Sequence, residues 1–168
     1  MFLHLLISFC LYWGQFATPP REQAPAFRLQ DVAGKAVALQ DFRGKVVYLD
    51  FWFSGCGPCL AQAPAAQRLN QRFKGKDVVF LYISTDAVVE TWRASIVSHK
   101  LDGPNTVHLL DPEGRAFRAY RAQGYPTYFL IGRNGELLQR AAPRPSAGRT
   151  IIRAIEQALE EKTAPNLK

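Results

Sequence analysis

The sequence is poor in the residues that bind metals or cross-link a fold. Its 168 residues include only three cysteines and three histidines. A tetrahedral zinc site needs four cysteine or histidine ligands at matching spacing, and Cys56 and Cys59 would supply two of them. The remaining candidates are His4, Cys10, His99 and His108. Because these form no second pair, zinc is the less favoured interpretation and we assign no metal ligand.

Runs of charge of one sign are also lacking, as are internal repeats and low-complexity segments. The net charge is +7, but lysines and arginines occur singly, with acidic residues between them. This distribution is typical of a solvated surface, so we do not expect nucleic-acid binding. With 48% hydrophobic residues, the chain is long enough to form one domain with a substantial core.

The N-terminus is apolar but short. Residues 2–16 are mostly hydrophobic, and a linker rich in proline and charge follows at residues 18–23. A membrane span needs about 20 apolar residues, whereas the core of a signal peptide needs about 7–15. We therefore interpret residues 1–17 as a signal or short membrane anchor, although no lysine or arginine stands before the apolar run. The end of a longer precursor and a lipid-modified Cys10 are the alternatives.

The most informative motif is Cys56-Gly57-Pro58-Cys59, which follows an apolar run at residues 46–52. The run predicts a buried β-strand, and the glycines after it predict a turn into a helix. Free N–H groups at a helix N-terminus stabilise a thiolate, so we expect a lowered pKa for Cys56. Cys59 would lie one turn further, shielded behind Cys56, where it can attack a mixed disulfide. The motif indicates a redox-active dithiol, since an inert disulfide would add little stability in so small a ring.

With this motif, the chain resembles the TlpA/ResA-like thiol–disulfide oxidoreductases of the thioredoxin fold, over roughly residues 24–162. Residues 24–35 and 37–45 are similar to a lead-in hairpin that these proteins share with peroxiredoxins. Peroxiredoxins carry a threonine three residues before a single peroxidatic cysteine, whereas this chain has Phe53 there and a second cysteine after the first. The resemblance implies a central mixed β-sheet, flanked by helices on both faces and extended by an N-terminal β-hairpin.

The apolar periodicity predicts the element order of that fold. Further strands are expected over residues 78–84, 106–110, 127–131 and 136–140, the last two joined at Asn134-Gly135. Helices are expected after Cys59 with a bend at Pro64, over residues 86–99 and 112–120, and from Ser146 as its cap to about residue 159. Residues 163–168 are expected to form a tail.

The resemblance also implies site residues outside the cysteine pair. Asp50, six residues before Cys56, matches the buried acidic residue of thioredoxins. Burial raises the pKa of a carboxyl, so Asp50 would accept the proton of Cys59; a water-exposed aspartate at the strand end is the alternative. Trp52 matches a tryptophan packed beneath the active site, although ordinary core filling explains it equally well.

Substrate contacts are expected from two loops. Gly57 and Pro58 lie between the cysteines, and the segment 124–127 resembles the family's cis-proline loop, which pairs with an extended substrate. Tyr125 and Pro126 would lie opposite the cysteines, with Tyr125 facing the Cys56 sulfur. Gly55 stands where a tryptophan usually precedes the first cysteine in this family, which leaves the range of substrates open.

The expected function is therefore reduction or exchange of protein disulfides by an extracytoplasmic enzyme. The resemblance implies a monomer that is kept reduced by a membrane electron donor, in cytochrome maturation or envelope thiol repair. The Cys56 and Cys59 pair would carry the electrons, so no further cofactor is expected. The alternative is a non-catalytic interaction module of the thioredoxin fold, which would not need both cysteines.

Overall fold

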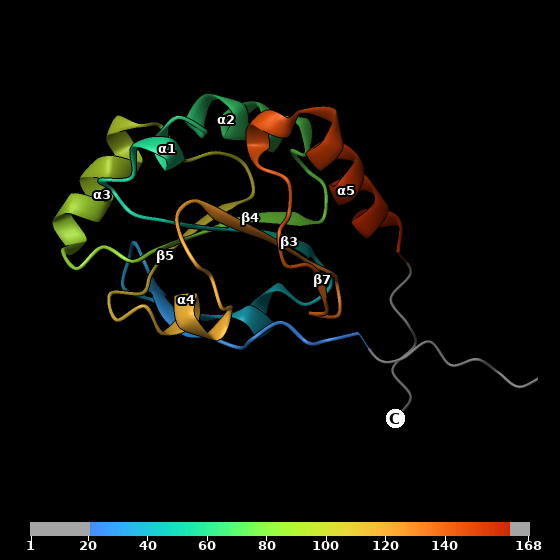
Figure 1. The fold of residues 1–168 in the computed structure, drawn as a ribbon, viewed down its shortest axis with the longest axis horizontal. Coiled ribbons are helices and arrows are strands. Elements are labelled where there is room, and N and C mark those ends of the chain that lie inside the picture. The colour runs from blue at the N-terminus through green and yellow to red at the C-terminus, as the bar shows by residue number, and fades with distance from the viewer. Residues whose placement is uncertain (1–20, 162–168) are drawn as a thin grey trace, which may run out of the picture.

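The computed structural model describes residues 21–161. They form three layers, of which the middle one is a seven-stranded sheet (Figure 1). The strand order is β2-β1-β5-β4-β3-β6-β7. Adjacent strands β3, β4 and β5 run parallel and the other pairs run antiparallel, so the predicted mixed sheet is confirmed. The strands are β1 (Arg28–Asp31), β2 (Ala36–Ala38), β3 (Val46–Trp52), β4 (Val78–Ser84), β5 (Thr106–Leu110), β6 (Thr127–Ile131) and β7 (Leu137–Gln139).

The two long central strands are buried along their whole length. All seven residues of β3 and all seven of β4 are buried, which explains why both are nearly continuous apolar runs, with Asp50 and Ser84 as the polar exceptions. Their side chains alternate between two cores. Tyr48 and Trp52 point into one core, whereas Leu49 and Phe51 belong to the other.

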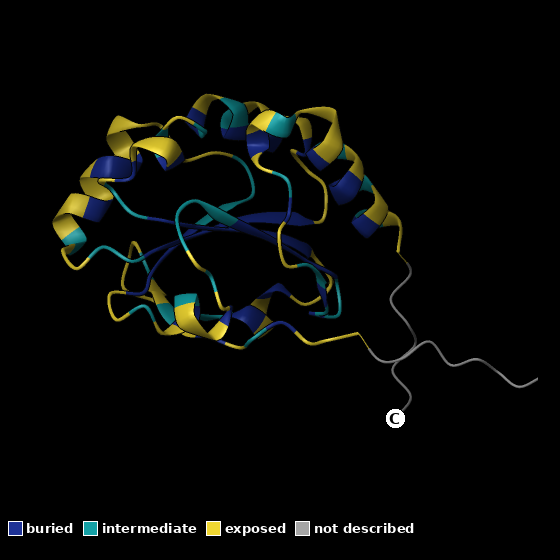
Figure 2. Ribbon diagram, in the orientation of Figure 1, coloured by how far each residue is buried: buried dark blue, intermediate teal, exposed yellow. Residues whose placement is uncertain are grey.

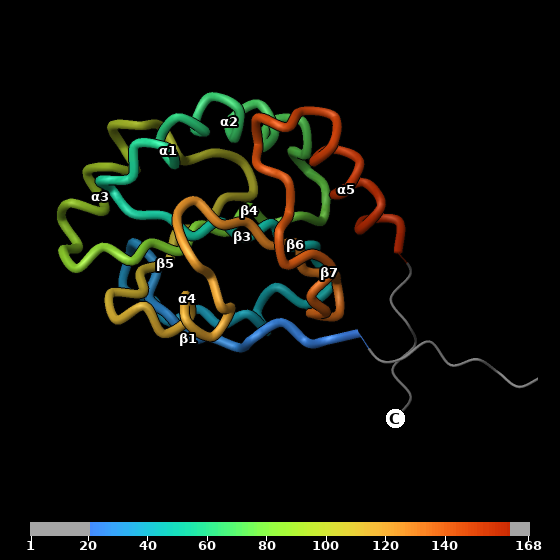
Figure 3. Tube along the Cα trace, in the orientation of Figure 1, coloured from blue at the N-terminus to red at the C-terminus, as the bar shows by residue number. Residues whose placement is uncertain are grey.

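Helices cover the first core, as Figure 2 shows by the dark-blue residues that they turn toward the sheet. They are α1 (Gly57–Leu60), α2 (Ala63–Arg72), α3 (Val89–Ser98) and α5 (Arg149–Glu160). The second core is covered by α4 (Arg115–Ala119), the short helical turn η1 (Leu39–Phe42) and the extended residues before β1. The Cα trace in Figure 3 shows these two groups on opposite sides of the sheet, as predicted.

Three helices differ from the prediction because specific polar contacts and a proline set their starts. The helix after Cys59 is divided into α1 and α2, and Pro64 lies in the first turn of α2, where its missing N–H breaks no helical bond. Helix α3 begins after Asp86, whose carboxylate accepts bonds from Ser54 instead. Helix α4 begins at Arg115, because the buried Asp111 carboxylate accepts the backbone N–H groups of its first turn.

The prediction that Ser146 caps the last helix is wrong. Ser146 lies within a 3-10 turn, η2 (Pro145–Ala147), and its backbone N–H donates to Oε1 of Gln62 over 3.0 Å. Helix α5 starts after this turn, and Gly148 is its N-cap at a φ of +57°, a region that favours glycine. The start of α5 therefore depends on the turn and not on a side-chain cap.

The expected N-terminal hairpin is present as the antiparallel pair β1 and β2. Part of the expected linker joins the fold, because Glu22 and Gln23 pair with the β7 hairpin through Leu137 and Glu136. Cys10, the apolar segment at residues 1–17 and the expected tail lie outside the described residues. Within residues 21–161, the helices are too short or too polar to cross a bilayer.

Candidate active site

The two cysteines lie where the sheet meets the first helix. Strand β3 ends at Trp52, and after a short turn Cys56 becomes the N-cap of α1, as predicted. Cys56 and Cys59 form a disulfide with their Cα atoms 5.3 Å apart. The backbone N–H of Cys59 donates to Cys56 Sγ over 3.1 Å. In the reduced protein the same donor would stabilise a Cys56 thiolate.

The turn before the cysteines is held by Asp86, a residue that the sequence analysis did not select. Its carboxylate accepts the backbone N–H of Ser54 over 3.0 Å and the Ser54 hydroxyl over 2.8 Å. Ser84 at the end of β4 donates to the same carboxylate over 2.6 Å. The signal in the sequence was the polar run that directly follows a buried strand. Asp86 therefore fixes the position of the loop that carries Cys56.

Both cysteines are buried in the disulfide state. Cys56 is 4% exposed and Cys59 is 7% exposed. In this state exposure therefore does not distinguish the two cysteines. The hydrogen bond that Cys56 Sγ accepts from the Cys59 N–H is what distinguishes the first sulfur.

Asp50 lies in the middle of β3 and is 6% exposed, so a water-exposed position at the strand end is excluded. Its partners in register are Tyr82 on β4 and Tyr128 on β6. Among the described residues, Oδ1 of Asp50 has no hydrogen-bond partner. Burial raises the pKa of Asp50 well above its usual value. A raised pKa makes the Asp50 carboxylate a stronger base than that of an ordinary aspartate.

A narrow cavity joins this carboxyl to the dithiol. Asp50, Trp52 and Cys59 all line it. Trp52 is 2% exposed, and its indole Nε1 has no hydrogen-bond partner among the described residues. The structure thus brings the expected acid, the tryptophan and the second cysteine together beneath α1.

The loop that contains Tyr125 and Pro126 lies beside the turn that carries the dithiol, and the peptide bond between these two residues is cis. The ring of Tyr125 packs edge-on against Phe53, with 5.1 Å between ring centroids, and stacks on Phe117 at 4.6 Å. Its hydroxyl pairs with the hydroxyl of Thr85 over 2.9 Å. Tyr125 is thus held by three contacts that the sequence alone did not reveal.

Gly57 and Pro58 are exposed at the surface of α1. Gly55 is also exposed, and the ring of Phe53 lies 3.1 Å from the point where a Cβ at position 55 would stand. A larger residue at position 55 would therefore require this ring to move. Exposed residues surround the buried sulfurs, so a substrate can approach the dithiol from this side.

Comparison with known proteins identifies the family. The model of the family described as Redoxin matches residues 19–155. The chain belongs to the redoxin family. It is 30% identical over 137 residues to the thiol-disulfide oxidoreductase ResA of Bacillus cereus, covering 79% of this chain and 78% of that relative. The same protein of Bacillus subtilis is 30% identical over 132 residues, with 77% and 70% coverage.

Solved structures agree with these relatives. The thioredoxin domain of a thiol-disulfide oxidoreductase from Bacteroides vulgatus superposes with a TM-score of 0.71 at 28% identity. The match covers 85% of this chain and all of that domain. The TlpA/ResA-like resemblance is therefore confirmed, and the chain is a thiol–disulfide oxidoreductase of the thioredoxin fold whose cysteine pair fits dithiol exchange.

Proposed function

We propose that this oxidoreductase reduces or exchanges the disulfides of other proteins, with Cys56 as nucleophile, Cys59 as resolving cysteine and Asp50 as proton acceptor. The observation that carries the proposal is the Cys56 to Cys59 disulfide at the start of α1, with the Cys59 N–H directed at Cys56 Sγ. This donor favours the thiolate on the first cysteine, which is the form that attacks disulfides.

The first step begins from the reduced protein. The Cys56 thiolate attacks one sulfur of the substrate disulfide, and a new sulfur–sulfur bond forms while the substrate bond breaks. The second substrate sulfur leaves as a thiolate. The product of this step is a mixed disulfide between Cys56 and the substrate.

The second step releases the substrate. The thiol of Cys59 transfers its proton to Asp50, and its sulfur attacks Cys56 Sγ. The substrate leaves with its second thiolate, so it has gained two electrons, and the protein is left with the disulfide that the structure shows. Because the two cysteines carry both electrons, the proposal requires no further cofactor.

Substrate binding is assigned to the exposed residues around the dithiol and to the loop beside it. Gly57 and Pro58 leave the approach to Cys56 open. The half-buried Tyr125 and Pro126 would pair with an extended substrate segment, and Trp52 would support the cysteines from below. We further propose an extracytoplasmic monomer that is reduced by a membrane electron donor, with the apolar residues 2–16 as signal or anchor.

The proposal is tested by reduction of insulin disulfides with dithiothreitol. The wild type should accelerate insulin precipitation, and Cys56→Ser should abolish the acceleration. Cys59→Ser should instead accumulate a mixed disulfide with insulin, because the first step is intact and the second is removed. Equal activity of wild type and Cys56→Ser would overturn the proposal and favour a non-catalytic interaction module.

A further inference from the structure

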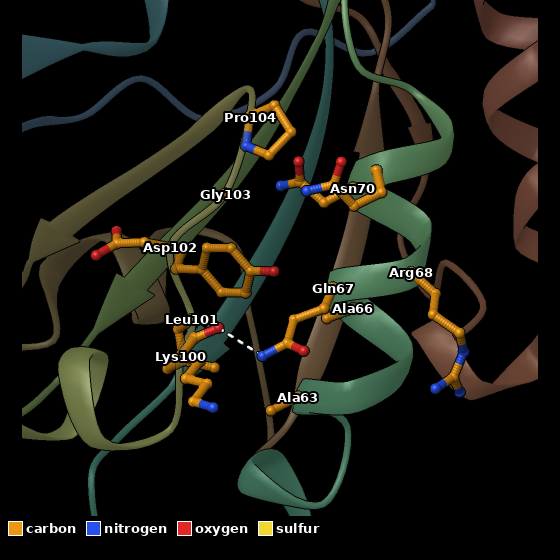
Figure 4. A pocket seen from close by; sticks show the side chains of 12 residues that line it. Ala63, Ala66, Gln67, Arg68, Asn70, Lys100, Leu101, Asp102, Gly103 and Pro104 are labelled. Carbon is orange, nitrogen blue, oxygen red and sulfur yellow. Dashed lines mark hydrogen bonds between the residues drawn. The ribbon is translucent and has the colours of Figure 1, made fainter.

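A second opening lies beside the narrow cavity at Asp50. It is a cleft of about 510 Å³ between α2 and the residues 100–104, which we call the strap. In Figure 4, Ala63, Ala66 and Asn70 lie along α2 on one side of the cleft, and the strap lies on the other. The side chain of Arg68 points away from the cleft.

The cleft and the narrow cavity next to Asp50 have four lining residues in common. Ala63, Ala66, Tyr82 and Leu101 line both spaces. The narrow cavity has about 10 Å³ of room for water, which is the space that one molecule needs. These shared side chains therefore lie between the cleft, which is open to solvent, and the narrow cavity that Asp50 lines.

The strap is held to α2 by one hydrogen bond in which the side chain of Gln67 donates to the Lys100 carbonyl over 2.7 Å (Figure 4). Asn70 lies beneath Gly103, with its amide carbon 3.2 Å from the position of a Cβ there. Neither polar atom of this amide has a hydrogen-bond partner among the described residues. Most of the contact between strap and helix is therefore packing. The backbone N–H of Leu101 donates to the Ile96 carbonyl over 3.0 Å, so its backbone is held, whereas its apolar side chain can move without breaking a hydrogen bond.

We propose that this cleft is the solvent entrance to Asp50, that the proton taken from Cys59 leaves through it, and that Leu101 is its gate. The proton passes from the Cys59 thiol to the Asp50 carboxylate, then to a water molecule in the narrow cavity, and from there to bulk water. This inference rests on the role of Asp50 in the proposed function.

The groups around Asp50 leave water as its main source of solvation. The titratable groups that face it are Cys59 on α1 and the tyrosines of the sheet, Tyr48, Tyr82 and Tyr128. Burial raises the pKa of all three tyrosines, so they stay neutral. The part of α2 that lines the cavity is uncharged, with Gln62, Ala63 and Ala66.

Among the described residues, charged groups lie farther out, with Arg144 acting on Tyr128. Lys100 and Asp102 line the outer cleft, and His108, which is stacked on Tyr82, lies 3.3 Å from the Asp102 carboxylate. Admission of water should therefore stabilise the Asp50 carboxylate directly, with no counter-ion to mask the effect.

Three variants of the full chain test the gate. Leu101→Ala opens the entrance, so the pKa of Asp50 should fall; Ala66→Leu fills it, so this pKa should rise. Ala65→Leu is the matched control, because Ala65 is on the same helix and lines neither space. The readout is the pH titration of the Asp50 carboxyl carbon by ¹³C NMR in the oxidised protein, which requires no activity.

The kinetic readout is the reaction of the reduced protein with 5,5′-dithiobis(2-nitrobenzoate). The first thionitrobenzoate is released when Cys56 attacks, and the second when Cys59 resolves the mixed disulfide. The pH midpoint of the second phase should fall in Leu101→Ala and rise in Ala66→Leu, in the same direction as the midpoint of the NMR titration. The first phase should stay unchanged in all three variants.

Opposite shifts of the Asp50 pKa in Leu101→Ala and Ala66→Leu, with no shift in Ala65→Leu, would support the inference. Shifts in the same direction, or no shift in either, would overturn it. If circular dichroism shows that Leu101→Ala does not fold, the shift of the Asp50 pKa in Ala66→Leu is the deciding result. Shifts by NMR without any change in the second kinetic phase would support the entrance but overturn the role of Asp50 in the proposed function.

Discussion

Replacement of Asp50 by asparagine should remove a pH-dependent loss of stability. Burial raises the pKa of Asp50, so the native state holds its proton more tightly than the unfolded chain, in which an aspartate has a pKa of about 3.9. The free energy of unfolding of the wild type should therefore fall as pH rises above that value, until the pKa of the folded state is passed. Asp50→Asn cannot titrate and has nearly the same size, so this fall should be absent.

The size of this pH dependence follows from the titration of one proton. Between the two pKa values the native state binds one proton more than the unfolded chain, so the stability of the wild type falls by about 1.4 kcal/mol per pH unit. The advantage of Asp50→Asn should grow with this slope and become constant above the native pKa. The pH at which it becomes constant reports the pKa of Asp50 in the folded protein.

Urea unfolding of both proteins between about pH 4 and 9 is the measurement. Both should be oxidised, so that Cys56 and Cys59 do not titrate in either state. Other buried groups such as His108 are present in both proteins and cancel in the difference. A difference that stays constant over the whole pH range would refute the reasoning, because it would mean that Asp50 has its ordinary pKa in the fold.

Three further predictions follow from single contacts. In the reduced protein, iodoacetamide should modify Cys56 faster than Cys59, because the Cys59 N–H stabilises the first thiolate; equal rates by peptide mass spectrometry would contradict this. Asp111→Ala should lower the free energy of unfolding by about 1–3 kcal/mol in urea, since three amides lose their acceptor, whereas an unchanged midpoint would contradict the capping role. His108→Phe should reduce the loss of unfolding free energy that occurs as the pH falls below about 6.5. Burial lowers the pKa of His108, so the unfolded chain binds the proton more tightly than the native state does. Parallel acid profiles of the free energy of unfolding for the two proteins would argue against this.

The strands could be predicted closely because burial alone determines them. Strands β3 and β4 have the predicted bounds, since both faces of each strand are covered and every position is apolar or packed. Helix starts were harder to predict because they depend on distant partners. Asp86 binds Ser54 and Asp111 accepts from the first turn of α4, so α3 and α4 begin later than the predicted residues 86 and 112.

The same distinction holds at the site. The cysteine motif and the burial of Asp50 depend on neighbours along β3 and α1, so both could be predicted from the local sequence. The burial of both sulfurs, the contacts of Tyr125 with Phe53 and the support from Asp86 arise between segments far apart in the chain. A periodicity argument cannot show such contacts, because it describes one element at a time.

The burial of Asp50 connects stability with catalysis in this fold. Each unit by which burial raises its pKa destabilises the native state at neutral pH by about 1.4 kcal/mol and makes the carboxylate a tenfold stronger base. The rest of the core must offset this cost, and within residues 21–161 no counter-ion balances the carboxyl at the centre of β3. Changes that relieve the cost, by removal of the charge or by admission of water past Leu101, should therefore weaken the proton acceptor that Cys59 requires. Stability at neutral pH and basicity of Asp50 should vary in opposite directions across such variants.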